Sequence, residues 1–153
     1  MEVLVEPEER YWYPDDGGIV WLAGYQPIGA DGRFLARDAP ELAAAGLTIS
    51  GVAGARFNTG ALASDAAGPG CPLHLRRDPG NEHDPNAIAV LLPGGEQLGW
   101  VPRELAAELA PELDAGRPLS AVVLRESRAS PRDPRTGVTM LVGRAQSVTL
   151  RVR

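Results

Sequence analysis

Residues Leu75–Val90 read LRRDPGNEHDPNAIAV, and this stretch decides how the chain is organised. Ala87–Leu92 is an apolar run of strand length, and Cys71–Arg76 is a second strand-like run before the loop. The Asp-Pro, Pro-Gly and Asp-Pro-Asn steps between them form turns, because Asp and Asn side chains bond nearby amides and proline fixes φ. One such turn suffices to join two strands, yet this loop also carries arginine, asparagine, histidine and two aspartates. The stretch predicts two strands joined by an unusually polar loop.

Short apolar runs separated by turns continue on both sides of this loop. The expected strands are Leu47–Phe57, Cys71–Arg76, Ala87–Leu92, Gln97–Val101, Leu119–Arg125, Val138–Gly143 and Ser147–Val152. Many short strands with one helix inserted before the last three are typical of a small, helix-capped barrel. We therefore predict a mainly β fold, a small OB-like β-barrel of about six strands with one inserted helix, over residues 47–153.

The inserted helix is predicted at Pro102–Ala115, where proline suits the first turn and Gly116 ends the helix. Its apolar residues recur every four positions and form one stripe toward the core: Leu105, Leu109 and Leu113. Pro111 is expected to kink the helix or to split it, because proline lacks the N–H of a helix interior.

Residues 1–46 differ in pattern and are predicted to form an N-terminal extension that packs on the main domain. Ala30–Gly32 is a turn signal, so Val20–Tyr25 and Arg33–Ala36 are expected to pair as a hairpin. A short helix is predicted at Pro40–Ala45. The acidic surroundings of Tyr11–Tyr13 favour packing or a protein contact there over nucleic-acid binding.

Composition excludes several function classes. The chain has 153 residues and a net charge of −5, which argues against a non-specific nucleic-acid binder coated in positive charge. All 15 basic residues are arginine, so P-loop lysine and Schiff-base chemistry are excluded. A single cysteine rules out an internal disulfide. No run is long enough for a membrane span and no signal peptide is evident, so we expect a cytoplasmic protein without membrane contact.

The enzyme motifs G-x-S-x-G, H-E-x-x-H and C-x-x-C are absent. The two histidines, His74 and His83, are too few for a typical zinc site. We expect a binding protein rather than an enzyme, with no metal and no cofactor.

Three separated blocks carry a family resemblance: Val52–Asn58 (VAGARFN), Leu75–Val90, and Gln97–Leu105 (QLGWVPREL). In this order and at this spacing they resemble the HIRAN domain family, over residues of about 50 to 150, and suggest a free-standing bacterial-type member. The resemblance implies an OB-like barrel of about six strands with a helix. It also implies a module that grips the 3′ end of single-stranded DNA, as at the front of a fork-remodelling helicase, and that occurs with helicases and nucleases.

The resemblance assigns expected roles to four residues. Arg56 matches a phosphate-contacting arginine, and Phe57 matches an aromatic that stacks on a terminal base. Asn81 matches a loop asparagine near the end nucleotide. Asp84 matches the carboxylate that accepts a hydrogen bond from the terminal 3′-hydroxyl.

The sequence departs from the family pattern at neighbouring positions. His83 stands in place of a second stacking tyrosine, and Asn58 replaces the tyrosine expected after Phe57. Pro102 stands where a lysine is expected, which leaves Arg103 as the basic residue at the helix start. The site therefore retains its carboxylate but has less aromatic area and less positive charge.

Two functions remain open on the sequence. One is a module that recognises 3′-hydroxyl ends of single-stranded DNA in repair, replication-fork processing or defence, working with a helicase or nuclease partner. The expected DNA-binding residues are then Arg56, Phe57, Asn81, His83, Asp84 and Arg103. The alternative is a protein-interaction or scaffolding barrel that has lost DNA binding. Trp100 is expected to serve packing rather than base stacking.

Overall fold

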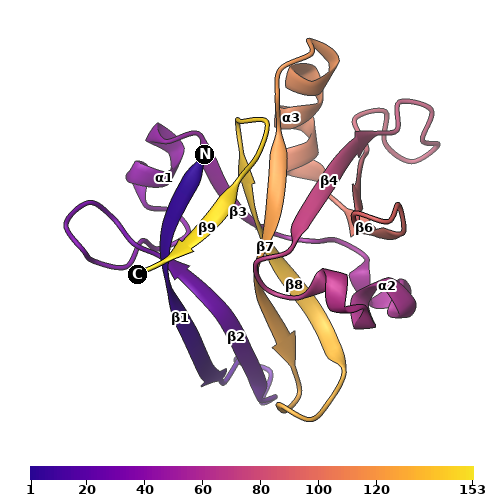
Figure 1. The fold of residues 1–153 in the computed structure, drawn as a ribbon. Helices are drawn as coiled ribbons and strands as arrows, with labels where there is room; N and C mark the ends of the chain where they lie inside the picture. The colour runs from indigo at the N-terminus through magenta and orange to yellow at the C-terminus, as the bar shows by residue number, and fades with distance from the viewer.

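A computed structural model describes residues 1–153 and shows a mainly β chain of nine strands (Figure 1). The strands are β1 (Glu2–Trp12), β2 (Val20–Pro27), β3 (Leu47–Gly51), β4 (Pro72–Arg77), β5 (Ile88–Leu91), β6 (Gln97–Trp100), β7 (Ser120–Arg128), β8 (Arg135–Gly143) and β9 (Thr149–Val152). Every strand predicted after residue 46 is present. The mainly β prediction is confirmed.

The helices are short except for one. They are α1 (Pro40–Ala44), the 3₁₀ turn η1 (Ala55–Phe57), α2 (Thr59–Ala63), the 3₁₀ turn η2 (Asp65–Ala67) and α3 (Arg103–Asp114). None of them combines the length and the apolar character that crossing a bilayer requires. The predicted inserted helix corresponds to α3, which continues through Pro111 as one element and is not split.

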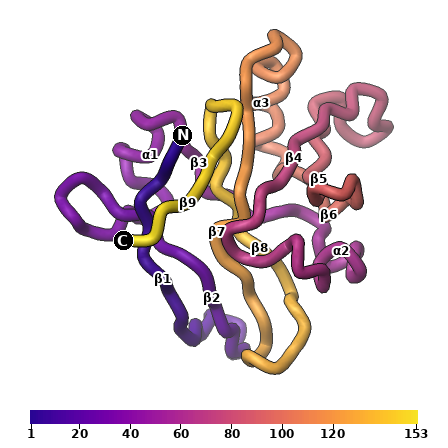
Figure 2. Tube along the Cα trace, in the orientation of Figure 1, coloured from indigo at the N-terminus to yellow at the C-terminus, as the bar shows by residue number.

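Strand β7 organises the sheet, because it is hydrogen-bonded along both edges. One edge pairs with β8, and the other pairs first with β4 and then with β2. From β4 the sheet continues to β5 and β6, and from β2 it continues to β1 and β9. Strand β3 pairs with β8. The two arms of the sheet therefore diverge from β7, as Figures 1 and 2 show.

Closure of the sheet into a barrel is not established by these strand pairs, since the path from β6 to β9 is open. A single antiparallel bridge joins Ala53, just beyond β3, to Trp100 at the end of β6. Its two backbone hydrogen bonds measure 2.8 and 2.9 Å. The OB-like barrel therefore stays a prediction.

Two apolar cores lie on opposite faces of β7, because successive strand residues point to opposite sides. Ala121 and Val123 belong to one cluster with α3, while Val122 and Leu124 belong to the other with β1 and α1. Leu109 of α3 is almost fully buried in the first cluster. The first core holds α3 and β4–β6 together and thereby positions the loop between β4 and β5.

The N-terminal segment is paired differently from the hairpin expected in the sequence. Strand β2 pairs with β1 rather than with Arg33–Ala36, which contributes one isolated bridge between Ile28 and Phe34. The expectation was wrong because Pro7 and the glutamates around it interrupt the run of strand-forming residues in β1. Pairing with β2 and β9 stabilises it nonetheless. The short helix was predicted correctly at Pro40 and ends one residue earlier than expected.

Candidate functional site

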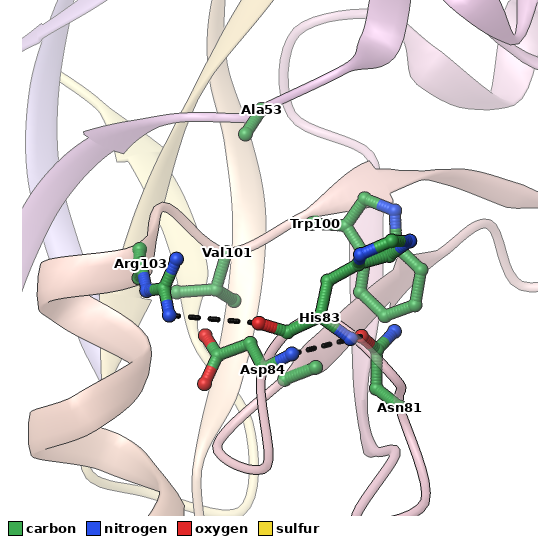
Figure 3. Close-up of a pocket in the computed structure, with 8 residues that line it drawn as sticks. Ala53, Asn81, His83, Asp84, Trp100, Val101 and Arg103 are labelled. Carbon is green, nitrogen blue, oxygen red and sulfur yellow. Dashed lines mark hydrogen bonds between the residues drawn. The ribbon is translucent and has the colours of Figure 1, made fainter.

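A pocket of about 280 Å³ opens where the β4–β5 loop faces the end of β6 and the start of α3 (Figure 3). It is lined by Ala53, Asn81, His83, Asp84, Ala87, Trp100, Val101 and Arg103. Four of the six predicted site residues therefore meet in one pocket: Asn81, His83, Asp84 and Arg103. The other two, Arg56 and Phe57, do not line it.

Asn81 shapes the loop that forms one wall of this pocket. Its Oδ1 accepts hydrogen bonds from the backbone amides of His83 and Asp84, at 2.9 and 3.1 Å. Its Nδ2 donates to the Asp78 carboxylate at 3.2 Å. The Asn81 side chain therefore stabilises the loop, and this role places it beside the pocket.

Only one of the two carboxylate oxygens of Asp84, which lines the pocket, is hydrogen-bonded within the protein. Its Oδ1 accepts the backbone N–H of Asn86 at 2.9 Å, and its backbone carbonyl accepts the N–H of Ala87. The second carboxylate oxygen has no hydrogen-bond partner in the protein, and no arginine forms an ion pair with it. Figure 3 shows this carboxylate on the Arg103 side of the pocket. The bond to Asn86 therefore fixes the carboxylate, and its second oxygen is free to accept a hydrogen bond.

Arg103 provides the positive charge beside that carboxylate. As the first residue of α3 it reaches the loop, where its Nη2 donates to the carbonyl of His83 at 3.5 Å. Its guanidinium forms no ion pair, so most of its donors remain open. The imidazole of His83 is exposed at the pocket edge.

Arg77 fixes the base of the loop. Its guanidinium pairs with Asp114 at the end of α3 through two hydrogen bonds of 2.9 and 3.2 Å, and it also donates to the carbonyl of Ala87. The hydrogen bond to Asp114 is the main cause that raises the pKa of Arg77, while burial opposes it; Asp84 and Asp78 add smaller attractions. The loop is thereby tied to both ends of α3.

Gly99 allows the backbone of Ala53, on the opposite wall of the pocket, to approach β6 closely. A side chain on it would collide with the carbonyl oxygen of Ala53, the residue whose backbone pairs with Trp100. Trp100 itself is only half buried and lines the pocket, which sequence reasoning had assigned to packing. Its position at the end of a strand, directly before the helix that carries Arg103, was the signal that could have identified it.

Arg56 and Phe57 lie beside the pocket rather than in it. The expected strand ends at Gly51, and Gly54, with φ of +73°, turns the chain into η1. Phe57 is 76% exposed, and the Arg56 guanidinium lies 4.8 Å from its ring centre. A side chain on Gly54 would touch both Phe57 and Trp100, so the two rings flank this glycine.

Asn58, the departure that follows Phe57, has a structural role. Its Nδ2 donates to the carbonyl of Leu98 at 3.1 Å and to that of Gly54 at 3.4 Å. These bonds hold η1 against β6. The residue therefore keeps Phe57 in place but offers no stacking surface of its own.

The family model for the HIRAN domain matches residues 45–141, which include the whole pocket. The chain belongs to the HIRAN domain family. Strands β1, β2 and β9 and the helix α1 lie outside the matched segment of this HIRAN chain.

Known proteins resemble parts of this HIRAN chain. A Fanconi-associated nuclease 1 homolog from Oryza sativa subsp. japonica is 54% identical over 48 residues, which are 29% of this chain and 5% of that protein. The chain therefore corresponds to a small part of that relative. The crystal structure of the HIRAN domain of human HLTF is 27% identical, with a TM-score of 0.48, covering 66% of this chain and 78% of that one. A protein from Lactobacillus plantarum is 20% identical, with a TM-score of 0.42, covering 62% and 91%.

Proposed function

We propose that the pocket between the β4–β5 loop and α3 binds the 3′-hydroxyl end of single-stranded DNA. The free carboxylate oxygen of Asp84 is the observation that carries this proposal. It is held by the Asn86 amide on its other oxygen and faces a pocket that also contains the Arg103 guanidinium. It accepts the terminal hydroxyl, and Arg103 contacts the last phosphate.

Selectivity for a free hydroxyl follows from the charge of Asp84. A carboxylate accepts a hydrogen bond from a 3′-hydroxyl but repels a 3′-phosphate. A strand that continues past this point has no free 3′-hydroxyl and cannot donate a hydrogen bond to the carboxylate. Arg103 offsets the repulsion between the carboxylate and the internal phosphates. The specificity is therefore built partly from repulsion.

The aromatic side chains around the pocket stack on the bases next to the 3′ end of the DNA. Trp100 lines the pocket, and the exposed ring of Phe57 lies on the other side of Gly54. Stacking on an aromatic ring contributes about 1–3 kcal/mol per base and tolerates any base. Arg56, held over Phe57, is in reach of a phosphate on the same path.

The OB-like barrel is part of the same proposal. Strands β3, β8, β7, β4, β5 and β6 follow one another in hydrogen-bonded order, and the Ala53–Trp100 bridge leads from β6 back to the chain beyond β3. This ring of six strands supports a barrel with the pocket at its point of closure.

We place this module, as a binding domain without catalysis of its own, in cytoplasmic DNA repair, fork processing or defence. The nuclease named among its relatives supports a nuclease or helicase as the working partner. Because the chain matches only a small part of that relative, the catalytic step belongs to the partner in this proposal.

A fluorescence anisotropy titration with short labelled oligonucleotides tests the proposal. Two strands of equal sequence are compared, one ending in a 3′-hydroxyl and one in a 3′-phosphate. We expect the hydroxyl strand to bind about 10-fold more tightly or better, since one charge-assisted hydrogen bond is replaced by repulsion. Equal affinity would overturn the end-recognition proposal, and negligible binding of both would favour the scaffolding alternative.

A further inference from the structure

A second concave surface lies mainly on β1, β2 and β9, outside the segment that matches the family, with Pro69, Gly70 and Pro72 of that segment at its edge. Two hollows, of about 540 and 240 Å³, share Tyr25 as a common wall. The first also contains Pro7, Trp21 and Pro69, and the second contains Pro72 and residues of β9. Together they form a groove, here called the β2 groove, divided by the Tyr25 ring.

The register of β1 and β2 explains why aromatic residues and proline gather here. Pro7 pairs with Tyr25 and Tyr11 pairs with Trp21, so these four side chains share one face of the hairpin. The Trp21 indole N–H donates to Glu9 Oε1 at 3.2 Å, which fixes the ring. The Tyr25 hydroxyl has no partner in the protein and is open as a donor at the wall between the hollows.

Two carboxylates line the β2 groove, those of Glu8 and Glu9, and both lie in its first hollow. Glu8 is neutralised by ion pairs with Arg10 and Arg125, at 2.6 and 3.1 Å. Glu9 lines the first hollow, forms no ion pair and has one oxygen free beside the Trp21 ring. Glu9 therefore offers a partner for one cationic side chain in the first hollow.

We propose that the β2 groove binds a proline-rich segment of a partner protein that carries arginine next to its prolines. A polyproline II helix inserts its side chains into hollows between aromatic residues and loses little conformational entropy on binding. Two hollows on either side of Tyr25 suit two successive turns of such a helix. Its carbonyl groups lack internal hydrogen bonds, and the Tyr25 hydroxyl donates to one of them. Glu9 pairs with the arginine.

This surface is separate from the DNA pocket. In Figures 1 and 2 the β1–β2 arm lies on the opposite side of the molecule from α3, β5 and β6. A bound peptide and a bound DNA end do not compete for the same residues. The groove therefore provides a site for a partner that does not depend on DNA binding.

A titration of the full chain with a fluorescent peptide of two arginines followed by ten prolines tests the proposal. Two control peptides replace the arginines by glutamates or the prolines by a glycine-serine repeat. We expect saturable binding of the first peptide below about 1 mM, a level typical of a small interface. The controls should bind at least about 5-fold more weakly. Absence of saturation, or equal binding of either control, would overturn the proposal.

Variants locate the binding on the chain. Glu9→Gln keeps the acceptor for Trp21 but removes the charge, and Tyr25→Phe removes only the hydroxyl. Each should weaken the arginine-proline peptide about 3- to 10-fold, the range of one hydrogen bond or ion pair. The matched controls Asp15→Asn and Tyr13→Ala change an exposed acid and an exposed aromatic outside the hollows and should leave affinity unchanged.

Oligonucleotide binding by the same variants separates this proposal from the first one. Glu9→Gln and Tyr25→Phe should bind the 3′-hydroxyl oligonucleotide as the unmodified chain does. If these substitutions reduce oligonucleotide binding and leave peptide binding intact, the β2 groove serves nucleic acid and the proposal is wrong. If Tyr13→Ala weakens the peptide as much as Glu9→Gln does, the peptide does not sit in the groove and the proposal is equally wrong.

Discussion

The carboxylate of Asp84 differs from an ordinary turn residue in having one oxygen bound and one free. Asp84→Asn keeps an oxygen for the Asn86 amide and turns an NH₂ group toward the pocket. An NH₂ group donates to a phosphate and does not repel it. We expect this variant to lose about 10-fold or more of the preference for a 3′-hydroxyl over a 3′-phosphate, measured by anisotropy.

The control for this variant is Glu82→Gln, which makes the same charge change in the same loop. Glu82 is exposed and does not line the pocket. Its substitution should leave the preference for the hydroxyl unchanged. If both variants alter the preference equally, the effect comes from general charge and not from Asp84 in the pocket.

Gly99 occupies a position between Leu98 and Trp100 where the backbone of Ala53 leaves no room for a side chain. Gly99→Ala places a methyl group against the Ala53 carbonyl and so disturbs the bridge to Trp100. We expect the free energy of unfolding to fall by about 1–3 kcal/mol, as for other overpacked sites. Urea unfolding measures this. Gly94→Ala, where an added methyl meets nothing within 4 Å, should change it little, and a similar loss in both variants would refute the explanation.

Glu126 gives the fold a predictable sensitivity to acid. Burial alone would raise the pKa of its carboxyl, but hydrogen bonds from Arg128 and Arg135 outweigh burial and lower the pKa below its ordinary value of 4.5. Arg135 also holds the carbonyls of Leu62 and Ser64, so this pair fastens α2 to β8. Because the folded pKa is the lower one, the stabilisation is complete above about pH 4.5 and is lost as the pH falls through the folded value.

Urea midpoints measured between pH 6 and pH 3 test this dependence. We expect the midpoint to fall with acidification in the unmodified chain. Glu126→Gln should be less stable at pH 6, because Arg128 and Arg135 lose their shared charged partner, and should show a smaller fall toward pH 3. An equally steep fall in this variant would place the acid sensitivity elsewhere.

Among the elements, those with local signals were predictable from the sequence. Strands β4 to β6 and the helix α3 follow apolar runs with proline and glycine at their ends. Strand β1 was not predictable, because its glutamates and Pro7 disfavour a strand locally and its stability comes from pairing with β2 and with β9, the latter distant in the sequence. The small helix α2 was missed because glycine, serine and aspartate interrupt the alanines of its segment, as in a loop.

Part of the candidate site was predictable, because local sequence signals mark the segments that carry it. The β4–β5 loop and the start of α3 were expected to carry the site, and four of its residues do meet in one pocket. Trp100 and Ala53 were not expected there, because their contact depends on a backbone bridge between segments almost fifty residues apart. Arg56 was expected on a strand, but Gly54 turns the chain so that Arg56 lies over Phe57.

Pro111 lies inside helix α3, where no contact in the structure requires a proline. Pro111 is exposed in the third turn of α3 and lacks the N–H of a helix interior. Pro111→Ala restores that N–H and removes the steric clash of the ring, at a smaller cost from greater freedom of the unfolded chain. We expect the free energy of unfolding to rise by about 1–3 kcal/mol in urea titrations. A lower value would show that the proline stabilises a particular helix geometry.

For the molecule as a whole, β7 joins the two arms that carry the proposed binding surfaces. The arm with β4, β5 and β6 holds the pocket with Arg103, and the arm with β2, β1 and β9 holds most of the β2 groove, including Glu9. The arms diverge from one strand, as Figure 1 shows. In these proposals a nucleic-acid end and a partner protein bind on different sides of one small fold.

Chemical-shift mapping by NMR identifies the residues that a bound DNA end contacts. A four-nucleotide strand with a free 3′-hydroxyl is added to the isotope-labelled chain, and the backbone amide signals are followed. We expect the largest shifts in the β4–β5 loop, at the end of β6 and at the first residues of α3, with β1 and β2 unaffected. Shifts confined to the β1–β2 arm, or none at saturating strand, would contradict it.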